Sequence, residues 1–330
     1  MTGGDALRLH GLEVSFPAPG GGRVRAVRGV DLALGAGRVL AVIGESGSGK
    51  STVLLAIAGL LGKGAAVIGN LHLAGVPGDL LAPGVSRRGV AGRHIGMVFQ
   101  NPGASLNPVL TIGSQIDEVV ATHQALSGVA VRAATLSLLA RVGVGDTERR
   151  AAAFPHQLSG GLKQRVAIAA ALAGRPRLVL ADEPTTALDA TVQAQIFDLL
   201  LDLVDRDGIG LILVTHDMAV AGSVADDIAV MYAGRVVESG PARELMDRPA
   251  HPYTAALIAA ALPLAPGPAP ARGDAPFPEL PPPDMGAVGA GCDFAPRCRF
   301  ATDQCRAARP APEAREGRLV ACFEAGKGAP

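Results

Sequence analysis

A glycine-rich segment near the start of the chain has the composition and spacing of a loop that binds phosphate groups. It consists of Gly44, Glu45, Ser46, Gly47, Ser48, Gly49, Lys50, Ser51 and Thr52. A short apolar run precedes it and a helical pattern follows it, which is the context that a P-loop requires. The glycines let successive backbone N–H groups turn toward an anion, and the positive end of the helix adds to the attraction. We therefore expect a nucleotide here, with Lys50 on its outer phosphates and Ser51 on Mg²⁺.

Two adjacent carboxylates follow a second apolar run, residues 178–181. Because side chains alternate along a strand, Asp182 and Glu183 cannot perform the same role. We expect Asp182 to hold Mg²⁺ or its water shell. Glu183 is then placed to act as a general base on a water molecule that attacks the terminal phosphate. A helix cap or a surface charge is the minor alternative, given the loop upstream.

A further pair of glycines lies in the segment LSGGLKQR, residues 158–165. Ser159 is expected to cap a helix that runs through Val166 to Leu172. Gly160 and Gly161 would expose N–H groups at the positive end of that helix, which makes it a second phosphate-binding surface. A serine and two glycines in this position are equally typical of a plain N-cap.

The apolar pattern predicts the strands that must position these residues. Alternating apolar and polar residues over Leu7 to Phe16 and Val30 to Leu34 indicate antiparallel strands of a small sheet. Four continuous apolar runs, VLAVIG, HIGMVFQ, LVLADEP and LILVTHD, fit strands buried on both faces of a mainly parallel sheet. A hairpin is expected over residues 227–240, turning at Ala233 and Gly234, and a helix after Pro241.

Two further segments divide the chain. Helical spacing of apolar residues over Thr111 to Ala153 predicts a helical insertion between the second and third of the four runs. A Pro-rich linker, Pro263 to Pro283, precedes a tail that contains all four cysteines. We therefore expect one domain over residues 1–250, with a helical subdomain at about 101–160, and a C-terminal extension over residues 251–330.

The segment 158–165 resembles the signature sequence of ABC transporter ATP-binding domains, with Leu162 where many members have Gln. The resemblance covers about Leu7 to Gly240. It implies an α/β fold, namely a P-loop NTPase core (RecA-like) with an antiparallel β subdomain, an α-helical subdomain and a small Cys-containing C-terminal extension. It also implies that the signature of one subunit closes over ATP held by the P-loop of another. The residues expected to face the partner's ATP are Ser159, Gly160, Gly161, Lys163 and Gln164.

The remaining motifs of the resemblance follow in order along the chain. Gln100 matches the glutamine that senses Mg²⁺ and the terminal phosphate, Asp189 matches the D-loop and His216 matches the switch histidine. Phe16 lies where the family stacks an aromatic ring on adenine, although many members have Tyr there. Taken singly, these residues also fit a loop amide, a helix cap, a strand-end histidine and a core aromatic. The resemblance assigns catalysis to Glu183, His216 and Gln100, Mg²⁺ to Ser51, Gln100 and Asp182, and ATP to Phe16, Gln100, Asp182 and residues 44–52.

A narrower resemblance extends to the end of the chain. The segments FQNPGASLNP, FPHQLSGGLKQR and HPYTAALIAA and the cysteine tail are similar to the ATPases of dipeptide, oligopeptide and nickel importers. This implies ATP-driven uptake of peptides, with nickel or another solute as the alternative. The implied partners are two transmembrane permeases, an extracytoplasmic solute-binding protein and a second, often non-identical ATPase subunit. An alternative function is that of a regulatory subunit that binds ATP and hydrolyses little of it. The presence of Glu183 and His216 argues against this alternative.

The four cysteines of the tail are Cys292, Cys298, Cys305 and Cys322. Disulfides are disfavoured in a reducing cytoplasm. The spacings lack the C-x-x-C pairs usual for structural zinc and also differ from ferredoxin runs. The resemblance to peptide-importer ATPases implies a 4Fe–4S cluster on these residues, while zinc and unligated thiols remain open.

Composition limits the other partners. Lys+Arg and Asp+Glu are both 30, and aromatic residues make up 3% with no Trp. Neither a broad basic surface for nucleic acid nor a base-stacking surface is therefore expected. The N-terminus MTGGDALRLH lacks a secretory pattern, and the apolar runs are too short to span a bilayer. We expect a peripheral protein on the cytoplasmic face of the membrane, held there by its partners.

Overall fold

The fold is built on two sheets, seen in a computed structural model that describes residues 4–18, 20–87, 89–186, 188–261 and 289–327. The smaller sheet has three strands and the central sheet has eight. Across the central sheet the strands are β10 (Glu313–Arg315), β11 (Arg318–Val320), β9 (Arg235–Pro241), β8 (Asp227–Tyr232), β3 (Val39–Ile43), β7 (Gly210–Thr215), β6 (Leu178–Asp182) and β5 (Ile95–Val98).

The four continuous apolar runs form the parallel core, as predicted. β3, β7, β6 and β5 are successive parallel neighbours, and β3, β6 and β7 are buried along their whole length. Strands buried on both faces need apolar side chains on both, which explains why these runs do not alternate. Because parallel strands end at one edge, the loops after Ile43, Val98, Asp182 and Thr215 gather there. These loops carry every predicted catalytic residue.

The smaller sheet is antiparallel and consists of β1 (Asp5–Pro17), β2 (Arg23–Gly35) and β4 (Ala66–Leu73), with β1 in the middle. The pattern predicts β1 and β2 but not β4. Only Leu71 and Leu73 of β4 are fully buried; Gly69 interrupts the inner face that they share with Val67, and Ile68 lies on the exposed face, which weakens the alternation. Helix α1 (Lys50–Ala58) contacts β1, β2 and β6 and so lies between the two sheets.

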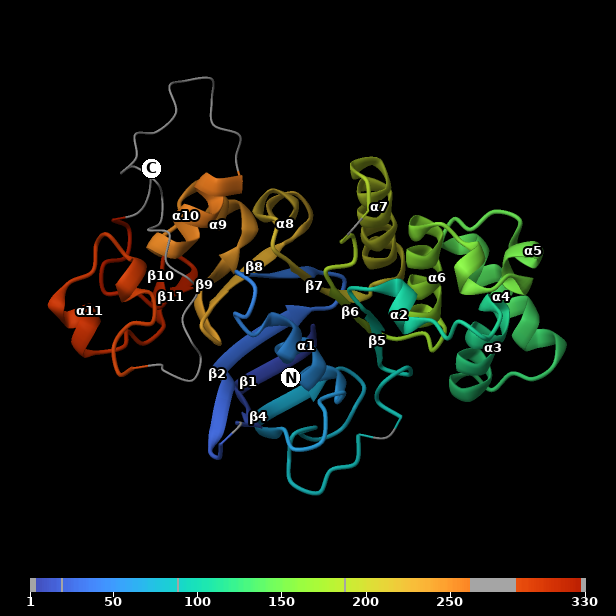
Figure 1. The fold of residues 1–330 in the computed structure, drawn as a ribbon, viewed down its shortest axis with the longest axis horizontal. Helices are drawn as coiled ribbons and strands as arrows, with labels where there is room; N and C mark the ends of the chain where they lie inside the picture. The colour runs from blue at the N-terminus through green and yellow to red at the C-terminus, as the bar shows by residue number, and fades with distance from the viewer. Residues whose placement is uncertain (1–3, 19, 88, 187, 262–288, 328–330) are drawn as a thin grey trace.

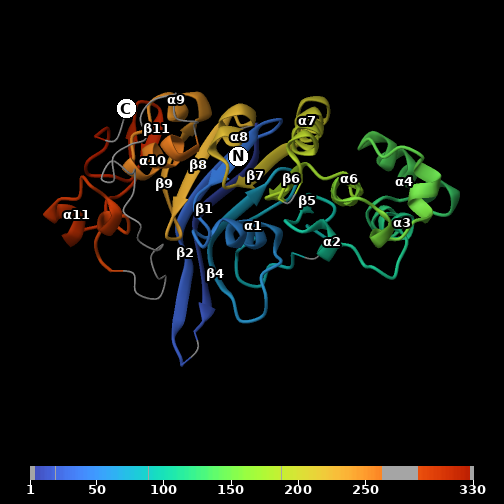
Figure 2. The same ribbon diagram turned by 45° about the horizontal axis from the view of Figure 1, so that its top comes forward.

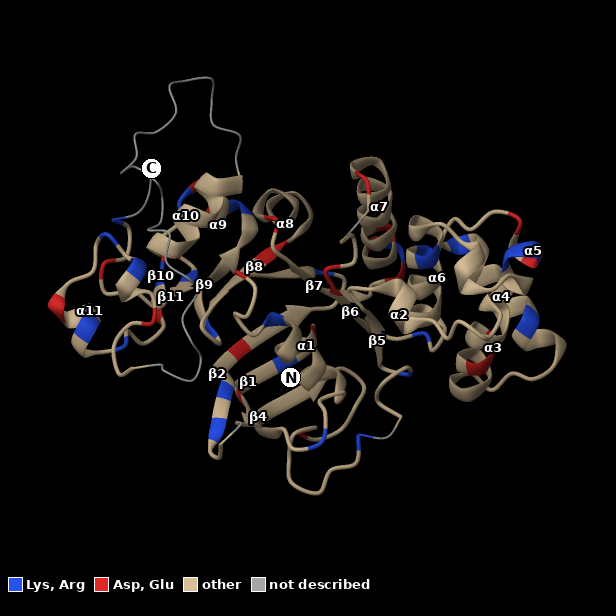
Figure 3. Cartoon of the chain, viewed as in Figure 1, with Lys and Arg blue, Asp and Glu red and all other residues tan. Residues whose placement is uncertain are grey.

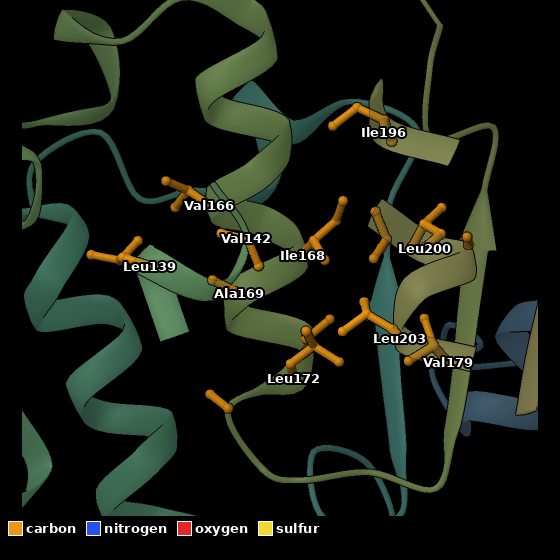
Figure 4. Close-up of a cluster of buried hydrophobic side chains, with 14 of the residues drawn as sticks. Leu139, Val142, Val166, Ile168, Ala169, Leu172, Val179, Ile196, Leu200 and Leu203 are labelled. Atoms are coloured by element: carbon orange, nitrogen blue, oxygen red, sulfur yellow. The ribbon is translucent and has the colours of Figure 1, made fainter. Parts of the chain in front are cut away.

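The predicted helical insertion is present as α3 (Ile112–His123), α4 (Val129–Arg141) and α5 (Thr147–Ala152), preceded by the short α2 (Pro102–Ser105). Figure 4 shows that α6 (Gly160–Leu172) joins this insertion to the rest of the core. Its Val166 lies toward Leu139 of α4, and its Leu172 lies toward Leu203 of α7 (Ala190–Asp207). Burial of each such side chain stabilises the folded state by about 1.5–3 kcal/mol relative to leaving it exposed. The insertion is therefore packed continuously onto α6.

The C-terminal elements complete the edge of the central sheet. The hairpin of β8 and β9 turns at Ala233 and Gly234, as predicted, and β9 pairs antiparallel with β11 of the cysteine tail. Helices α8 (Met218–Val224), α9 (Ala242–Asp247) and α10 (Pro252–Ala261) lie against this edge. The tail also holds α11 (Asp303–Ala307), whereas the predicted linker Pro263 to Pro283 falls outside the described residues. The extension is thus continuous with the sheet that carries the P-loop.

Figures 1 and 2 place the helical insertion and the C-terminal elements at opposite ends of the molecule, with the P-loop helix α1 between them. Lys and Arg are interspersed with Asp and Glu over most elements (Figure 3). None of the helices in the described ranges combines the length and apolar character that crossing a bilayer demands.

Candidate functional site

The P-loop leads from β3 into α1 at the carboxyl edge of the central sheet. A Cβ at Gly44 would lie 2.2 Å from the carbonyl oxygen of Met231, and one at Gly49 would lie 2.7 Å from that of Ala26. No larger residue fits at either position, so the loop packs closely on β8 and β2. Gly49 is the N-cap residue of α1, and no side chain caps the helix. The first N–H groups of α1 are therefore available to an anion such as a phosphate.

Lys50 is a buried cation beside two carboxylates. It is 6% exposed, and its Nζ donates hydrogen bonds to the carbonyl oxygens of Gly44 (2.7 Å) and Glu45 (2.9 Å). Burial lowers the pKa of Lys50, while the charges of Glu183 and Asp182 oppose that shift. A buried ammonium whose hydrogen-bond partners are backbone carbonyls is well suited to a phosphate ligand.

The predicted Mg²⁺ ligands Ser51 and Asp182 meet at the end of β6. The Ser51 hydroxyl donates to Asp182 Oδ1 at 3.1 Å, and Asp182 is 9% exposed. Burial raises the pKa of Asp182, which the Ser51 hydroxyl opposes. A hydroxyl and a carboxylate are the oxygen ligands that Mg²⁺ prefers, and a bound cation would favour the charged form of this carboxylate, so the pair fits the ion.

Glu183 is the residue on which the predicted catalytic residues converge. Its carboxylate accepts hydrogen bonds from the Gln100 amide at 3.0 Å and from the Thr186 hydroxyl at 3.1 Å. His216 Nδ1 lies 3.3 Å from its other oxygen. These residues follow three different strands, so the carboxylate ties three loops together. Gln100, predicted as a Mg²⁺ ligand as well, uses its amide nitrogen on Glu183 and not on Ser51 or Asp182.

The alternation argument for the acidic pair requires a correction. The strand ends at Asp182, and Glu183 has a φ of 44° in the left-handed region. Its N–H donates to the Val214 carbonyl oxygen at 2.9 Å, which holds this turn in place. The two carboxylates do have different surroundings, but a backbone turn separates them and not the alternation of a strand. A non-glycine residue in this region is uncommon and marks a site whose geometry is imposed by its surroundings.

The signature segment forms an exposed helix start, as predicted. Ser159 accepts a hydrogen bond from the N–H of Leu162 at 3.4 Å and caps α6. A Cβ at Gly161 would lie 2.8 Å from Val192 Cγ1, so the glycine lets α6 approach α7. Within the part of the chain that the structure describes, no hydrogen bond or ion pair links residues 159–163 to the P-loop. Gln164 is only 1% exposed, so its predicted contact with a partner's ATP does not fit its position.

Asp189 and Phe16 make the contacts expected of a helix cap and of a core aromatic residue. Asp189 Oδ1 accepts from the N–H of Val192 at 3.0 Å and caps α7. Phe16 lies partly buried near the end of β1, against the apolar cluster of the small sheet. The D-loop role of Asp189 and the adenine contact of Phe16 therefore stay predictions.

Three residues of the site were missed from the sequence: Thr186, Tyr253 and Arg297. The Tyr253 hydroxyl accepts from the N–H of Glu45 at 2.9 Å. Arg297 pairs with the Glu45 carboxylate through two hydrogen bonds of 2.8 and 2.9 Å. The Glu45 side chain, predicted to contact ATP, is thus bound to the C-terminal extension. Tyr253 lies in the segment HPY, which could have indicated its role from the sequence. No sequence pattern around Arg297 indicates a contact with the P-loop.

The four cysteines lie together in the tail but do not form a metal site. The N–H of Cys292 donates to the Cys305 carbonyl oxygen at 2.8 Å, and burial raises the pKa of Cys322 to about 12. Burial also raises the pKa of Cys292 and Cys298, which favours the neutral thiols. Across the described residues, no group of three or more His, Cys, Asp and Glu side chains is arranged to hold a metal ion. The structure therefore does not support the predicted iron–sulfur cluster.

Comparison with known proteins gives consistent matches. Residues 27–186 match the family described as ABC transporter, and residues 237–305 match the family described as oligopeptide/dipeptide transporter, C-terminal region. The dipeptide transport ATP-binding protein DppD of Escherichia coli is 41% identical over 317 residues, covering 93% of this chain and 91% of DppD. A Brucella ovis protein named as a peptide import ATP-binding protein is 45% identical over 293 residues, covering 86% of this chain and 87% of that protein.

A solved structure supports the fold. The dimeric post-hydrolysis state of the ATP-binding cassette MJ0796, bound to ADP and Pi, aligns with a TM-score of 0.63 at 30% identity. The alignment covers 72% of this chain and 99% of that one. The two family matches fall on the P-loop core and on the extension that contacts its P-loop. The chain therefore belongs to the ABC transporter ATPases, in the group whose members carry the oligopeptide/dipeptide transporter C-terminal region.

Proposed function

We propose that this chain is the ATP-hydrolysing subunit of an importer of dipeptides or oligopeptides. The observation that carries the proposal is the Glu183 carboxylate, bound by Gln100, Thr186 and His216 at the same sheet edge as the buried Lys50. Peptide as the solute is supported by the match of residues 237–305 and by the names of the relatives in Escherichia coli and Brucella ovis.

In the proposed reaction the P-loop N–H groups and Lys50 bind the phosphates of ATP. Glu183 accepts a proton from the attacking water, and His216 and Gln100 orient its carboxylate. Ser51 and Asp182 would hold Mg²⁺, which supplies neutralisation of the phosphate charge when bound. Gln100 lies two residues before α2, which leads into the helical insertion, so its contact with Glu183 connects the insertion to the proposed catalytic base.

A single chain holds one P-loop and one signature helix, and we infer that two ATPase subunits complete each other's sites. The N-cap of α6 at Ser159 is exposed and makes no contact with the P-loop of its own chain among the described residues. Its uncommitted N–H groups suit a phosphate bound by another subunit. The further partners that we propose are two permeases and a solute-binding protein, with this chain on the cytoplasmic face of the membrane.

Uptake by the assembled transporter tests the proposal. The chain would be co-expressed with the subunits that copurify with it, reconstituted into vesicles, and supplied with MgATP and either a labelled dipeptide or labelled Ni²⁺. We expect ATP-dependent accumulation of the dipeptide and stimulation of ATP hydrolysis by the peptide-loaded binding protein. Accumulation of Ni²⁺ without the dipeptide would replace the proposed solute.

The ligands that we propose are ATP and Mg²⁺ only. An iron–sulfur cluster is not included, because the described cysteines form no metal-binding group. Iron, acid-labile sulfide and zinc analysis of the anaerobically purified chain tests this choice. A stoichiometric amount of iron and sulfide, lost in a Cys298→Ser variant, would restore the cluster prediction.

A further inference from the structure

An ion pair joins the P-loop to the C-terminal extension across 252 positions of sequence. Both terminal nitrogens of Arg297 donate to the Glu45 carboxylate, at 2.8 and 2.9 Å. The Arg297 side chain is 9% exposed and that of Glu45 is 27% exposed. Two parallel charge-assisted hydrogen bonds fix orientation as well as distance, which a single contact does not.

Every polar group of Glu45 is engaged. Its carboxylate binds Arg297, its N–H donates to the Tyr253 hydroxyl at 2.9 Å, and its carbonyl oxygen accepts from Lys50 at 2.9 Å. Arg297 and Tyr253 belong to the extension and Lys50 is the phosphate-binding lysine, while the Glu45 carbonyl oxygen also accepts from the N–H of Ser48 within the loop at 3.2 Å. The extension thus contacts the first turn of the P-loop through both the side chain and the N–H of Glu45, whose carbonyl oxygen binds the Lys50 ammonium.

The groups that hold Glu45 are themselves fixed by an aromatic cluster. The ring of Tyr253 lies 4.7 Å from that of Tyr232 and 5.4 Å from that of Phe294, between centroids. The guanidinium of Arg297 lies over the rings of Tyr232 and Phe294, at 5.8 and 6.0 Å from their centroids. His251 Nδ1 accepts from the N–H of Tyr253 at 3.0 Å. Arg297 and Tyr253 therefore contact the loop from a packed and hydrogen-bonded platform.

A second ion pair fixes the tail at the same place. Arg28 of β2 donates to Asp293 at 2.9 Å, and both side chains are less than one-tenth exposed. Arg28 also donates to the Ala233 carbonyl oxygen, next to Gly234, whose N–H donates to the Ser48 carbonyl oxygen of the P-loop at 2.9 Å. The tail is thereby also anchored to β2, beside the β8–β9 turn that contacts Ser48 of the P-loop.

We propose that Arg297, assisted by Tyr253, is a positioning residue for ATP: it holds Glu45 so that the P-loop adopts its nucleotide-binding shape before the nucleotide arrives. The inference rests on the ATP hydrolysis in the proposed function and not on the identity of the solute. Both residues are inferred to act through Glu45 and not on the reacting atoms. A loop that is already ordered does not have to be ordered at the expense of binding free energy. Loss of Arg297 or Tyr253 should therefore weaken ATP binding, and raise the KM for ATP more than it lowers kcat.

The test compares three variants of the full-length chain, purified with its copurifying subunits. Arg297→Gln removes the ionic fork, and Tyr253→Phe removes only the hydroxyl that accepts from Glu45 and keeps the buried ring. Arg318→Gln is the control, since Arg318 of the same extension forms an ion pair with Glu238 of β9 that is even more deeply buried, and its hydrogen bonds and ion pairs within the described ranges do not include the P-loop. Steady-state ATP hydrolysis at varied MgATP, equilibrium MgATP binding and the melting temperature would be measured for each.

We expect the KM and the dissociation constant for MgATP to rise roughly 10- to 100-fold in Arg297→Gln and roughly 2- to 10-fold in Tyr253→Phe. Arg318→Gln should lower the melting temperature without either change. Wild-type affinity in both site variants, or an equal loss in Arg318→Gln, would overturn the inference. If Arg297→Gln does not fold, Tyr253→Phe decides alone. A wild-type chain that binds MgATP but does not hydrolyse it would refute the proposed function, while the binding comparison would still test Arg297.

Discussion

The side-chain amide of Gln100 donates a hydrogen bond to the carboxylate of Glu183, although 83 positions separate the two residues. The contact joins the loop after β5 to the loop after β6. Gln100 lies two residues before α2, which leads into the helical insertion. The site therefore contains a short physical connection between its proposed general base and the helical insertion, which lies at the opposite end of the molecule from the C-terminal extension (Figure 1).

Replacing Glu183 by Gln separates binding from hydrolysis. The amide cannot accept the proton of the attacking water, whereas Lys50 and Ser51 keep their places on the phosphates. We expect hydrolysis to fall by roughly 10²- to 10⁴-fold with little change in MgATP affinity. Thr186→Ala is the control, since it removes one hydrogen bond to the same carboxylate and leaves the base intact. Near-normal turnover by Glu183→Gln would remove the residue from its assigned role and favour a regulatory subunit.

Gly161→Ala tests whether the second signature glycine serves packing. The added methyl group would lie 2.8 Å from Val192 Cγ1, closer than side-chain carbons approach. We expect the free energy of unfolding to fall by about 1–3 kcal/mol. The double variant with Val192→Ala should recover most of that loss. Gly160→Ala, which meets Leu188 Cδ2 at 3.3 Å, should cost less. Denaturant titration measures all three, and a loss that Val192→Ala leaves unchanged would contradict the packing explanation.

Much of the fold could be predicted because its signals are local. A P-loop requires a strand, glycines and a helix in immediate succession, and a strand buried on both faces requires a continuous apolar run. β4 escaped prediction since most of its residues are partly or fully exposed. The left-handed turn at Glu183 could not be predicted, because it depends on the contact of this residue with β7. No pattern in the segment LVLADEP indicates that contact.

Contacts between distant segments could not be predicted. The pairing of β11 with β9, the ion pair of Arg297 with Glu45 and the burial of Gln164 all depend on how separate elements pack. Apolar periodicity gives the buried face of one element and not its neighbour. The extension was consequently expected as a separate unit beyond residue 250, and its contacts with the P-loop became visible only in the structure.

Asp182→Asn is expected to affect stability and MgATP binding in opposite directions. Burial raises the pKa of Asp182, so ionisation of this carboxylate costs the folded chain stability as the pH rises through that pKa. The neutral amide avoids this cost, so the nucleotide-free variant should melt at a higher temperature at neutral pH. Its MgATP affinity should fall at least about tenfold, since a cation ligand is lost. A lower melting temperature of the nucleotide-free variant would contradict this account.

His251 makes the stability of the chain depend on pH. The residue is 1% exposed, and burial lowers its pKa to about 3. Its Nδ1 accepts from the N–H of Tyr253, so the folded state needs the neutral ring. The unfolded chain binds the proton near its usual pKa of about 6.5. The contribution of His251 is therefore complete above that pH and is lost progressively as the pH falls toward 3.

Between these two pH values the free energy of unfolding should decrease by about 1.4 kcal/mol per pH unit through His251 alone. His251→Asn is the matched variant, because the amide oxygen can accept from the same N–H without titrating. Other groups titrate in both proteins, so the difference between their unfolding free energies isolates His251. That difference should shrink with the stated slope as the pH is lowered. Parallel curves from pH 7 to pH 4 would show that the ring titrates normally in the folded chain and that its burial is not maintained in solution.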